Sequence, residues 1–146
     1  MLQEKMAKIV VMQEPDEEFS RFLQSKLTRF NDMNSTLQDP RAQPLHIEVV
    51  DENGKFIGGV SAITYWGWVV IELFYINEQW RGQGIGKTLL EHTEAEAKKR
   101  GCERAHTSTY DFQALEFYRK MGYAVIGHMD DYPDGHTFYW LRKDFA

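Results

Sequence analysis

The stretch that decides the fold is VVIELFYINEQWRGQGIGKTLLEHTEAEAKKRG, residues 69–101. It begins with a nearly continuous apolar run, Val69–Ile76, which predicts a central strand buried on both faces of a sheet. A glycine-rich segment follows, and residues 84–100 then carry apolar side chains at helical spacing until Gly101 ends the helix. A buried strand that leads through a loop into an amphipathic helix is typical of a layered domain with α and β structure.

Upstream of this stretch, the sequence predicts a strand, a helix and a hairpin. Residues 8–12 form a short apolar run that indicates a strand, and apolar residues recur at three- and four-residue spacing from Phe19 to Phe30, which indicates a helix with one apolar face. The Asn-Gly pair within residues 51–54 is typical of a tight turn. It predicts a hairpin between strands over residues 45–50 and 55–65.

Downstream, strands and helices continue to alternate. Residues 104–110, 123–129 and 136–143 are expected to form strands. A second helix is expected over residues 112–121, with the Asp111 carboxylate capping its amide end. Strands that alternate with helices after an opening hairpin imply a mixed sheet flanked by helices.

Composition and charge restrict the class of protein. A length of 146 residues with 42% hydrophobic and 27% charged residues predicts a single domain over residues 1–146. The formal charge of -5 and the absence of a basic stripe argue against a nucleic-acid partner. No apolar run reaches the roughly 20 residues of a membrane span or resembles a signal peptide, and Cys102 is the only cysteine. We therefore expect a cytoplasmic protein with no membrane partner.

The strongest chemical signal is RGQGIGK, residues 81–87, between the predicted buried strand and helix. Glycines let an anion approach the backbone, and a helix N-terminus offers unpaired N–H groups and a positive dipole end, so this loop suits a pyrophosphate. The spacing does not fit a Walker A loop, because Gly82 and Gly86 enclose three residues rather than four. Nor does it fit G-x-G-x-x-G, because Lys87 and Leu89 stand where a glycine is needed.

The segment does contain R-x-x-G-x-G, formed by Arg81, Gly84 and Gly86 directly after an apolar strand. In this respect the chain resembles the GNAT superfamily of N-acetyltransferases, and residues 111–123, DFQALEFYRKMGY, resemble a later segment of the same family. The resemblance extends from about Gly58 to Lys143. It implies an α/β (α+β) fold with a mixed, mostly antiparallel sheet of six to seven strands flanked by helices.

The resemblance also implies an activity. An acetyl-CoA-dependent N-acetyltransferase would move the acetyl group directly to a primary amine of a small molecule or peptide, and small domains of this family often form homodimers. A non-catalytic module that binds or senses acyl-CoA is the alternative. A P-loop phosphotransferase is a third interpretation, weakened by the glycine spacing.

Two residues are candidates for catalysis. Tyr118 matches the position where many GNAT enzymes keep a tyrosine near the thioester sulfur, and it would act as general acid. Glu72 is a carboxylate inside the apolar strand, where burial of an unpaired charge is costly, and it is the candidate general base. Core packing of Tyr118 and a structural ion pair at Glu72 are the alternatives.

The resemblance assigns the coenzyme to the end of the apolar strand, the glycine loop and the start of the second helix. Backbone groups at residues 74–76 would face the thioester and the pantetheine, and Arg81 would reach a phosphate. Asp111 stands where the family often has asparagine, and a carboxylate donates no hydrogen bond. The expected coenzyme-binding residues are Phe74, Tyr75, Ile76, Arg81, Gly82, Gln83, Gly84, Ile85, Gly86, Lys87, Thr88, Asp111 and Tyr118.

Histidines and acidic residues gather near the C-terminus. The run from His128 to His136 contains Asp130, Asp131 and Asp134, but a polar hairpin turn explains it better than a metal site, and we expect no metal. In GNAT folds this late hairpin often borders the acceptor pocket, so an acidic turn would suit a cationic acceptor. The aromatic residues Tyr65, Trp66 and Trp68 could line the same pocket or pack as a turn.

Overall fold

A computed structural model describes residues 7–35 and 42–145, and the chain divides into two units after Asp39. In the first unit, helix α1 (Glu17–Asn34) begins at Asp16, whose carboxylate accepts hydrogen bonds from the N–H groups of Glu18 and Phe19. The predicted helix is confirmed, and none of its residues is buried. The predicted strand over residues 8–12 is wrong: this segment is exposed and pairs with no described strand, so its backbone gains no sheet hydrogen bonds.

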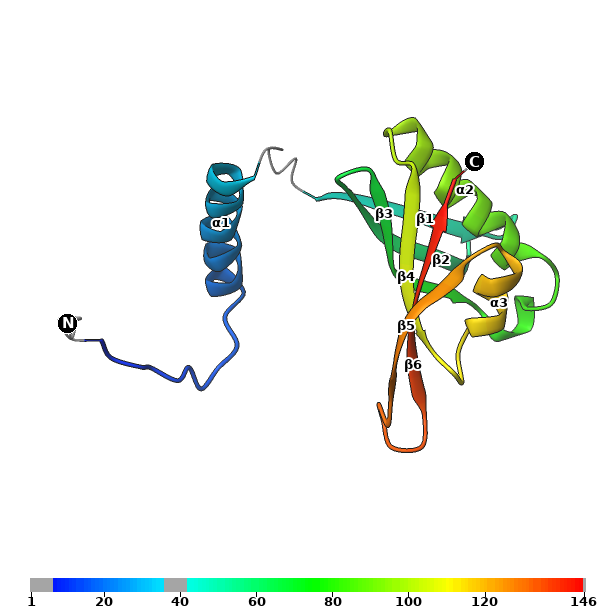
Figure 1. The fold of residues 1–146 in the computed structure, drawn as a ribbon. Helices are drawn as coiled ribbons and strands as arrows, with labels where there is room; N and C mark the ends of the chain where they lie inside the picture. The colour runs from blue at the N-terminus through cyan, green and yellow to red at the C-terminus, as the bar shows by residue number, and fades with distance from the viewer. Residues whose placement is uncertain (1–6, 36–41, 146) are drawn as a thin grey trace. The chain divides into compact units, whose positions relative to one another are not determined.

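The second unit contains one sheet of six strands (Figure 1). Its order is β1-β2-β3-β4-β6-β5, and every neighbouring pair is antiparallel except β3 and β4. The predicted mixed, mostly antiparallel sheet is therefore confirmed. The elements are β1 (Gln43–Val50), β2 (Phe56–Tyr65), β3 (Trp68–Ile76), the short 3-10 helix η1 (Glu78–Trp80), α2 (Ile85–Lys99), β4 (Arg104–Tyr110), α3 (Leu115–Lys120), β5 (Ala124–Asp130) and β6 (Thr137–Asp144).

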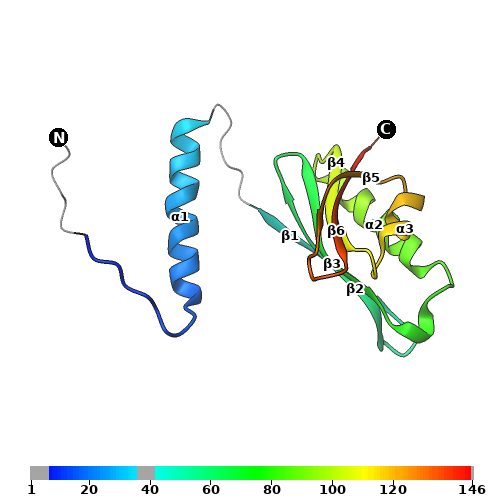
Figure 2. The same ribbon diagram turned by 60° about the horizontal axis from the view of Figure 1, so that its bottom comes forward.

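Helices α2 and α3 lie on the same face of the sheet (Figure 2). Two connections, β3–α2–β4 and β4–α3–β5, each join parallel strands through a helix, and both move across the sheet in the same direction. Because such crossovers are right-handed, both helices are placed on the same face. The face of α2 that contacts the sheet buries Leu89, Leu90 and Ala97, and these pack with Val69 and Leu141 in one apolar core. No helix described by the structure is long and apolar enough to span a membrane.

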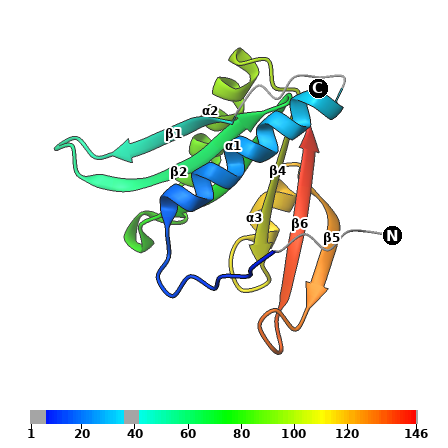
Figure 3. The same ribbon diagram turned by 90° about the vertical axis from the view of Figure 1, so that its left-hand side faces the viewer.

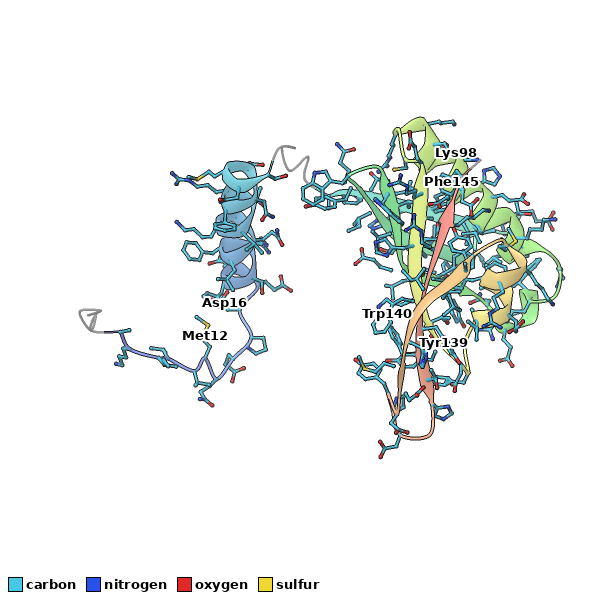
Figure 4. All side chains as sticks on the ribbon, viewed as in Figure 1. Met12, Asp16, Lys98, Tyr139, Trp140 and Phe145 are labelled. Atoms are coloured by element: carbon cyan, nitrogen blue, oxygen red, sulfur yellow. The ribbon has the colours of Figure 1, made fainter. Side chains whose placement is uncertain are left out.

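A polar cluster inside this core holds the helix and the sheet together. Glu94 is only 6% exposed, and its side chain accepts hydrogen bonds from Tyr123 Oη at 2.8 Å and from Lys143 Nζ at 2.9 Å. Burial, together with the neighbouring Glu94 carboxylate, raises the pKa of the Tyr123 phenol, so this group remains a hydrogen-bond donor. Lys98, one turn further along α2, lies over the Phe145 ring at 5.0 Å (Figure 4).

Candidate active site

Strands β3 and β4 separate in the middle of the sheet. Their parallel pairing begins at Trp68 and Arg104 and ends at Ile71 and Thr107, although both strands continue beyond this point. The backbone of residues 72–76 therefore has no strand partner on its β4 side. A cavity of about 930 Å³ opens here, and it is lined by both strands, by the glycine-rich loop and by the segment that leads into α3.

A β-bulge in β3 places Glu72 at this separation. Ser61 of β2 pairs with Leu73 while its neighbour Ala62 pairs with Ile71, so Glu72 has no partner on β2. The extra residue breaks the alternation of the strand, and the Glu72 side chain is exposed and lines the cavity. The prediction that β3 is buried on both faces is therefore wrong for this part of the strand. Within the described residues, no hydrogen bond or ion pair engages the Glu72 carboxylate.

The glycine-rich loop presents unpaired N–H groups to the cavity. Gly82 and Gly84 have φ angles of +78° and +82°, in the left-handed region that favours glycine, and Gly84 is the N-cap of α2. The first N–H of this helix with a backbone acceptor is that of Thr88, which donates to Gly84 O at 3.1 Å. Among the described residues, none accepts a hydrogen bond from the N–H groups of residues 82–87. This arrangement fits a diphosphate.

Arg81 attaches this loop to the end of β3. Its Nε donates to Ile76 O at 2.9 Å, and its guanidinium lies over the Tyr75 ring at 5.5 Å. These contacts restrict the orientation of the exposed Arg81 side chain. They leave the terminal guanidinium nitrogens available to an anion, since no described residue accepts from them.

Gly86 allows close packing between α2 and α3. A Cβ atom at this position would lie 3.3 Å from the Phe117 ring, which itself contacts the Phe74 ring at a centroid distance of 5.5 Å. A side chain at position 86 would require the Phe117 ring to shift by a few tenths of an ångström. The sequence motif thus combines Gly84, whose φ angle favours glycine, with Gly86, which lies close to the Phe117 ring.

Tyr118 lies on α3 and is 3% exposed, with its ring against those of Phe74 and Tyr123. Burial raises the pKa of the Tyr118 phenol, and an interaction with the Thr107 hydroxyl only partly opposes this. Tyr118 also lines the cavity. A phenol with a raised pKa is fully protonated at neutral pH, as a proton donor must be.

Most of the expected site residues meet at this one cavity. Those that line it are Glu72, Phe74, Tyr75, Ile76, Arg81, Gly82, Gly84, Ile85, Gly86, Lys87, Asp111 and Tyr118. Gln83 and Thr88 instead line a separate hollow of about 420 Å³ between α2 and β1. Their side chains donate to the carbonyls of Gln79 and Gly84, and the Thr88 N–H also donates to Gly84 O, so the Gln83 N–H is the backbone donor of this pair that remains a candidate for the coenzyme.

Asp111 has a different role from the one expected. Its Oδ1 lies 3.0 Å from His136 Nδ1 and its Oδ2 accepts from the Thr137 N–H at 3.0 Å, so it joins β4 to the start of β6. The predicted cap is wrong, because α3 begins only at Leu115. Partial burial acts to raise the pKa of Asp111, but the hydrogen bonds from Thr137 and His136 outweigh it and lower the pKa.

Residues that the sequence analysis missed complete the turn into α3. Thr109 Oγ1 accepts from the Ala114 N–H at 3.1 Å, and Gln113 Oε1 accepts from the Tyr110 N–H at 3.1 Å. Thr107 Oγ1 donates to Ile71 O at 2.9 Å. The alternation in RAHTSTY was the available signal, because it places Thr107 and Thr109 on the buried side of β4.

Other candidate residues are not brought to the cavity. Trp68 packs against His106 and lies under the guanidinium groups of Arg104 and Arg142. The rings of Tyr65 and Trp66 contact each other at a tilt of 44°, with a centroid distance of 4.4 Å. In the part of the chain that the structure describes, no cluster of three histidine, cysteine or acidic side chains could hold a metal ion.

Comparisons with known proteins agree with this geometry. The model of the Acetyltransferase (GNAT) family matches residues 8–123. The chain is 32% identical to acetyltransferase Atu2258 of Agrobacterium fabrum over 89% of this chain and 93% of that protein, and 34% identical to blasticidin-S acetyltransferase of Streptomyces morookaense over 70% and 79%.

Solved structures give the same result. An acetyltransferase from Bacillus cereus superposes with a TM-score of 0.82 at 28% identity over 93% of this chain and 98% of that one. A Bacillus anthracis protein determined in complex with acetyl coenzyme A shares the fold, with a TM-score of 0.65 at 18% identity over 73% and 65%. The paired motifs, the divided sheet and these similarities establish that the chain belongs to the GNAT family of acetyltransferases, which take their acetyl group from acetyl-CoA.

Proposed function

We propose that this protein transfers an acetyl group from acetyl-CoA directly to a primary amine of a small molecule or peptide. One observation carries the proposal: the unpaired N–H groups of residues 82–87 and the unpaired edge of β3 border the same cavity as Tyr118. Together they would form a continuous binding surface from a diphosphate to a thioester. All of these residues lie in the second unit of the chain.

Each part of the site then has a chemical task. When bound, acetyl-CoA would supply the acetyl group as a thioester. The N–H groups of the loop and Arg81 would hold the diphosphate, and the backbone of residues 74–76 would pair with the pantetheine amides and polarise the thioester carbonyl. As the amine nitrogen bonds to the acetyl carbon and the carbon–sulfur bond breaks, Glu72 would accept the proton of the amine. The Tyr118 phenol would supply a proton to the sulfur.

The acceptor proposed here is a cationic amine. Asp130, Asp131 and Asp134 lie in and beside the turn between β5 and β6, and an acidic surface raises the local concentration of cations. The relative from Streptomyces is named for a small-molecule acceptor, blasticidin S, which supports a small-molecule class for this protein.

We also infer a cytoplasmic enzyme that forms a homodimer. The free thiol of Cys102 is buried, as expected for a protein kept in a reducing compartment. Helix α1 carries an apolar face, which could contribute to the pairing of two copies.

The test is a screen for CoA release with purified protein, acetyl-CoA and amines from several classes: polyamines, amino acids, aminated antibiotics and peptides with free N-termini. Acetylation of at least one class, reduced in a Tyr118→Phe variant, is the expected result. Tight binding of acetyl-CoA with no CoA release on any amine would indicate the non-catalytic module instead. ATP binding in preference to CoA would exclude both.

A further inference from the structure

Three aromatic rings stack beside the cavity, where β4 ends. The Tyr110 ring is parallel to that of Phe112, with a centroid distance of 5.2 Å and an interplanar angle of 14°. Between the Tyr110 and Tyr132 rings, the centroid distance is 5.9 Å and the interplanar angle is 5°. We call Phe112, Tyr110 and Tyr132 the aromatic stack. Phe138 supports it from β6, with its ring edge-on to both tyrosines.

The aromatic stack is held in a fixed position. Tyr132 lies in the turn of the β5–β6 hairpin, which extends past the end of β4 (Figure 3). The hairpin is attached to β4 by the contacts of Asp111 with His136 and Thr137, and the His136 ring also packs edge-on against Phe112 at 4.9 Å. A ligand would therefore meet preformed rings and would lose little free energy in ordering them.

The aromatic stack is also open. Phe112 is 57% exposed and Tyr132 is 49% exposed. On a surface that binds no ligand, polar residues would serve equally well at these two positions. Phe112 and its neighbour Asp111 line the cavity that contains Glu72 and Tyr118. Exposed aromatic groups that border a cavity commonly mark a binding surface.

We propose that the aromatic stack binds a flat aromatic ring of the acceptor, so that the substrates are primary amines carrying an aryl or heteroaryl group. This inference rests on the proposed function and specifies its substrate class. Stacking requires a planar partner with a π face, which a saturated ring lacks. The acidic residues of the neighbouring turn, Asp131 and Asp134, favour the ammonium form of such an amine as it approaches.

The test compares two acceptors that differ only in the ring, 2-phenylethylamine and 2-cyclohexylethylamine. Both carry a primary alkylamine on the same two-carbon linker, so a difference in kcat/KM reports the ring. The wild-type protein should favour the phenyl compound by about two- to tenfold, the range expected for one stacking contact. Phe112→Leu and Tyr132→Leu should each reduce this preference and leave the KM for acetyl-CoA within about twofold.

The matched control is Phe56→Leu, which removes an equally exposed phenylalanine at the start of β2, outside the cavity. It should leave the preference unchanged. Equal kcat/KM for the two compounds in the wild-type protein overturns the inference, and so does a preference that survives both leucine variants. If other amines are acetylated and neither ring compound is, the inference fails while the proposed function stands. If no amine releases CoA, the proposed function itself has failed.

Discussion

Ile71 and Thr107 form the last pair between β3 and β4, and the Thr107 hydroxyl donates to the Ile71 carbonyl at 2.9 Å. The same hydroxyl interacts with the Tyr118 phenol. One threonine thus lies at the point where the sheet divides and also lowers the pKa of the proposed acid, against the larger effect of burial.

Replacing Tyr118 with phenylalanine should lower kcat by about ten- to a thousandfold, because the departing sulfur loses its proton donor. Equilibrium binding of acetyl-CoA, measured by calorimetry, should change little. Tyr123→Phe is the control, since it removes another buried phenol, one that donates to Glu94. That variant should lose stability and keep its kcat, and an unchanged kcat in Tyr118→Phe would remove this residue from catalysis.

Replacing Glu72 with glutamine should lower kcat/KM by about a hundredfold for an alkylamine. Removing a proton from the alkylammonium group at pH 7 costs about 4 to 5 kcal/mol, so a base must assist. For an α-amine, whose pKa is near 8, the loss should be smaller. Steady-state kinetics with the two acceptors measures the difference. Glu91→Gln, an exposed carboxylate on α2, should change neither value. The same loss for both acceptors would argue against a base at this position.

Replacing Gly84 with alanine should weaken acetyl-CoA binding. A Cβ at this N-cap would project beside the unpaired N–H groups, and the φ angle of +82° adds strain of about 1 kcal/mol. Gly101→Ala, at the other end of α2, has a similar φ of +89° and equally open surroundings. Both variants should lose similar amounts of Tm. Only Gly84→Ala should raise the Kd for acetyl-CoA, and equal affinities would show that the loop is merely structural.

Replacing Glu94 with alanine should lower the free energy of unfolding by about 3 kcal/mol, because it leaves the buried Tyr123 phenol and the partly buried Lys143 ammonium without their partner. Urea denaturation measures this change. The control is Glu96→Ala on the same helix, which breaks an exposed ion pair with Lys99 and should leave the urea midpoint nearly unchanged. Similar midpoints for both variants would contradict a stabilising role of the Glu94 cluster.

Asp111 should make the native state sensitive to acid. Its pKa is lowered in the folded protein, so its contribution to stability is complete above its unfolded pKa of about 3.9 and is lost as the pH falls through the lower native value. Asp111→Asn should therefore reduce Tm at neutral pH, and the difference from the wild type should disappear in strong acid. Asp134→Asn, which removes an exposed carboxylate of the hairpin turn, is the control and should leave the profile unchanged. A difference that persists at low pH would assign the effect to something other than the charge.

The sequence predicted the elements whose patterns were long and regular. The bounds of β4 follow from alternation in residues 104–110, and α2 follows from its apolar face and from Gly101. The loop motif and Tyr118 could be placed because their local sequence is specific. The helix cap predicted at Asp111 was wrong because the partners of this carboxylate, His136 and Thr137, lie about 25 residues away and nothing local indicates them.

The bulge at Glu72 could not be predicted for a similar reason. At a bulge, one strand has an extra residue that no residue of its partner strand opposes. The sequence of β3 alone does not show which of its residues are paired with β2. An apolar run that contains one carboxylate therefore suggested a buried charge, whereas the side chain is exposed. The residues of the aromatic stack were missed as a group because two segments about twenty residues apart contribute them: Tyr110 with Phe112, and Tyr132.

The short parallel pairing of β3 with β4 has a consequence for how this protein can diversify. Where β3 lacks a β4 neighbour, its main-chain atoms would form the recognition surface for the coenzyme in the proposed function, and every amino acid except proline supplies the same main-chain groups. An exposed side chain such as Leu73 can therefore change with little effect on how the coenzyme is held, whereas Phe74 and Tyr75 also contact other residues of the site. Selection for new acceptors can act on such exposed positions independently of how the coenzyme is bound.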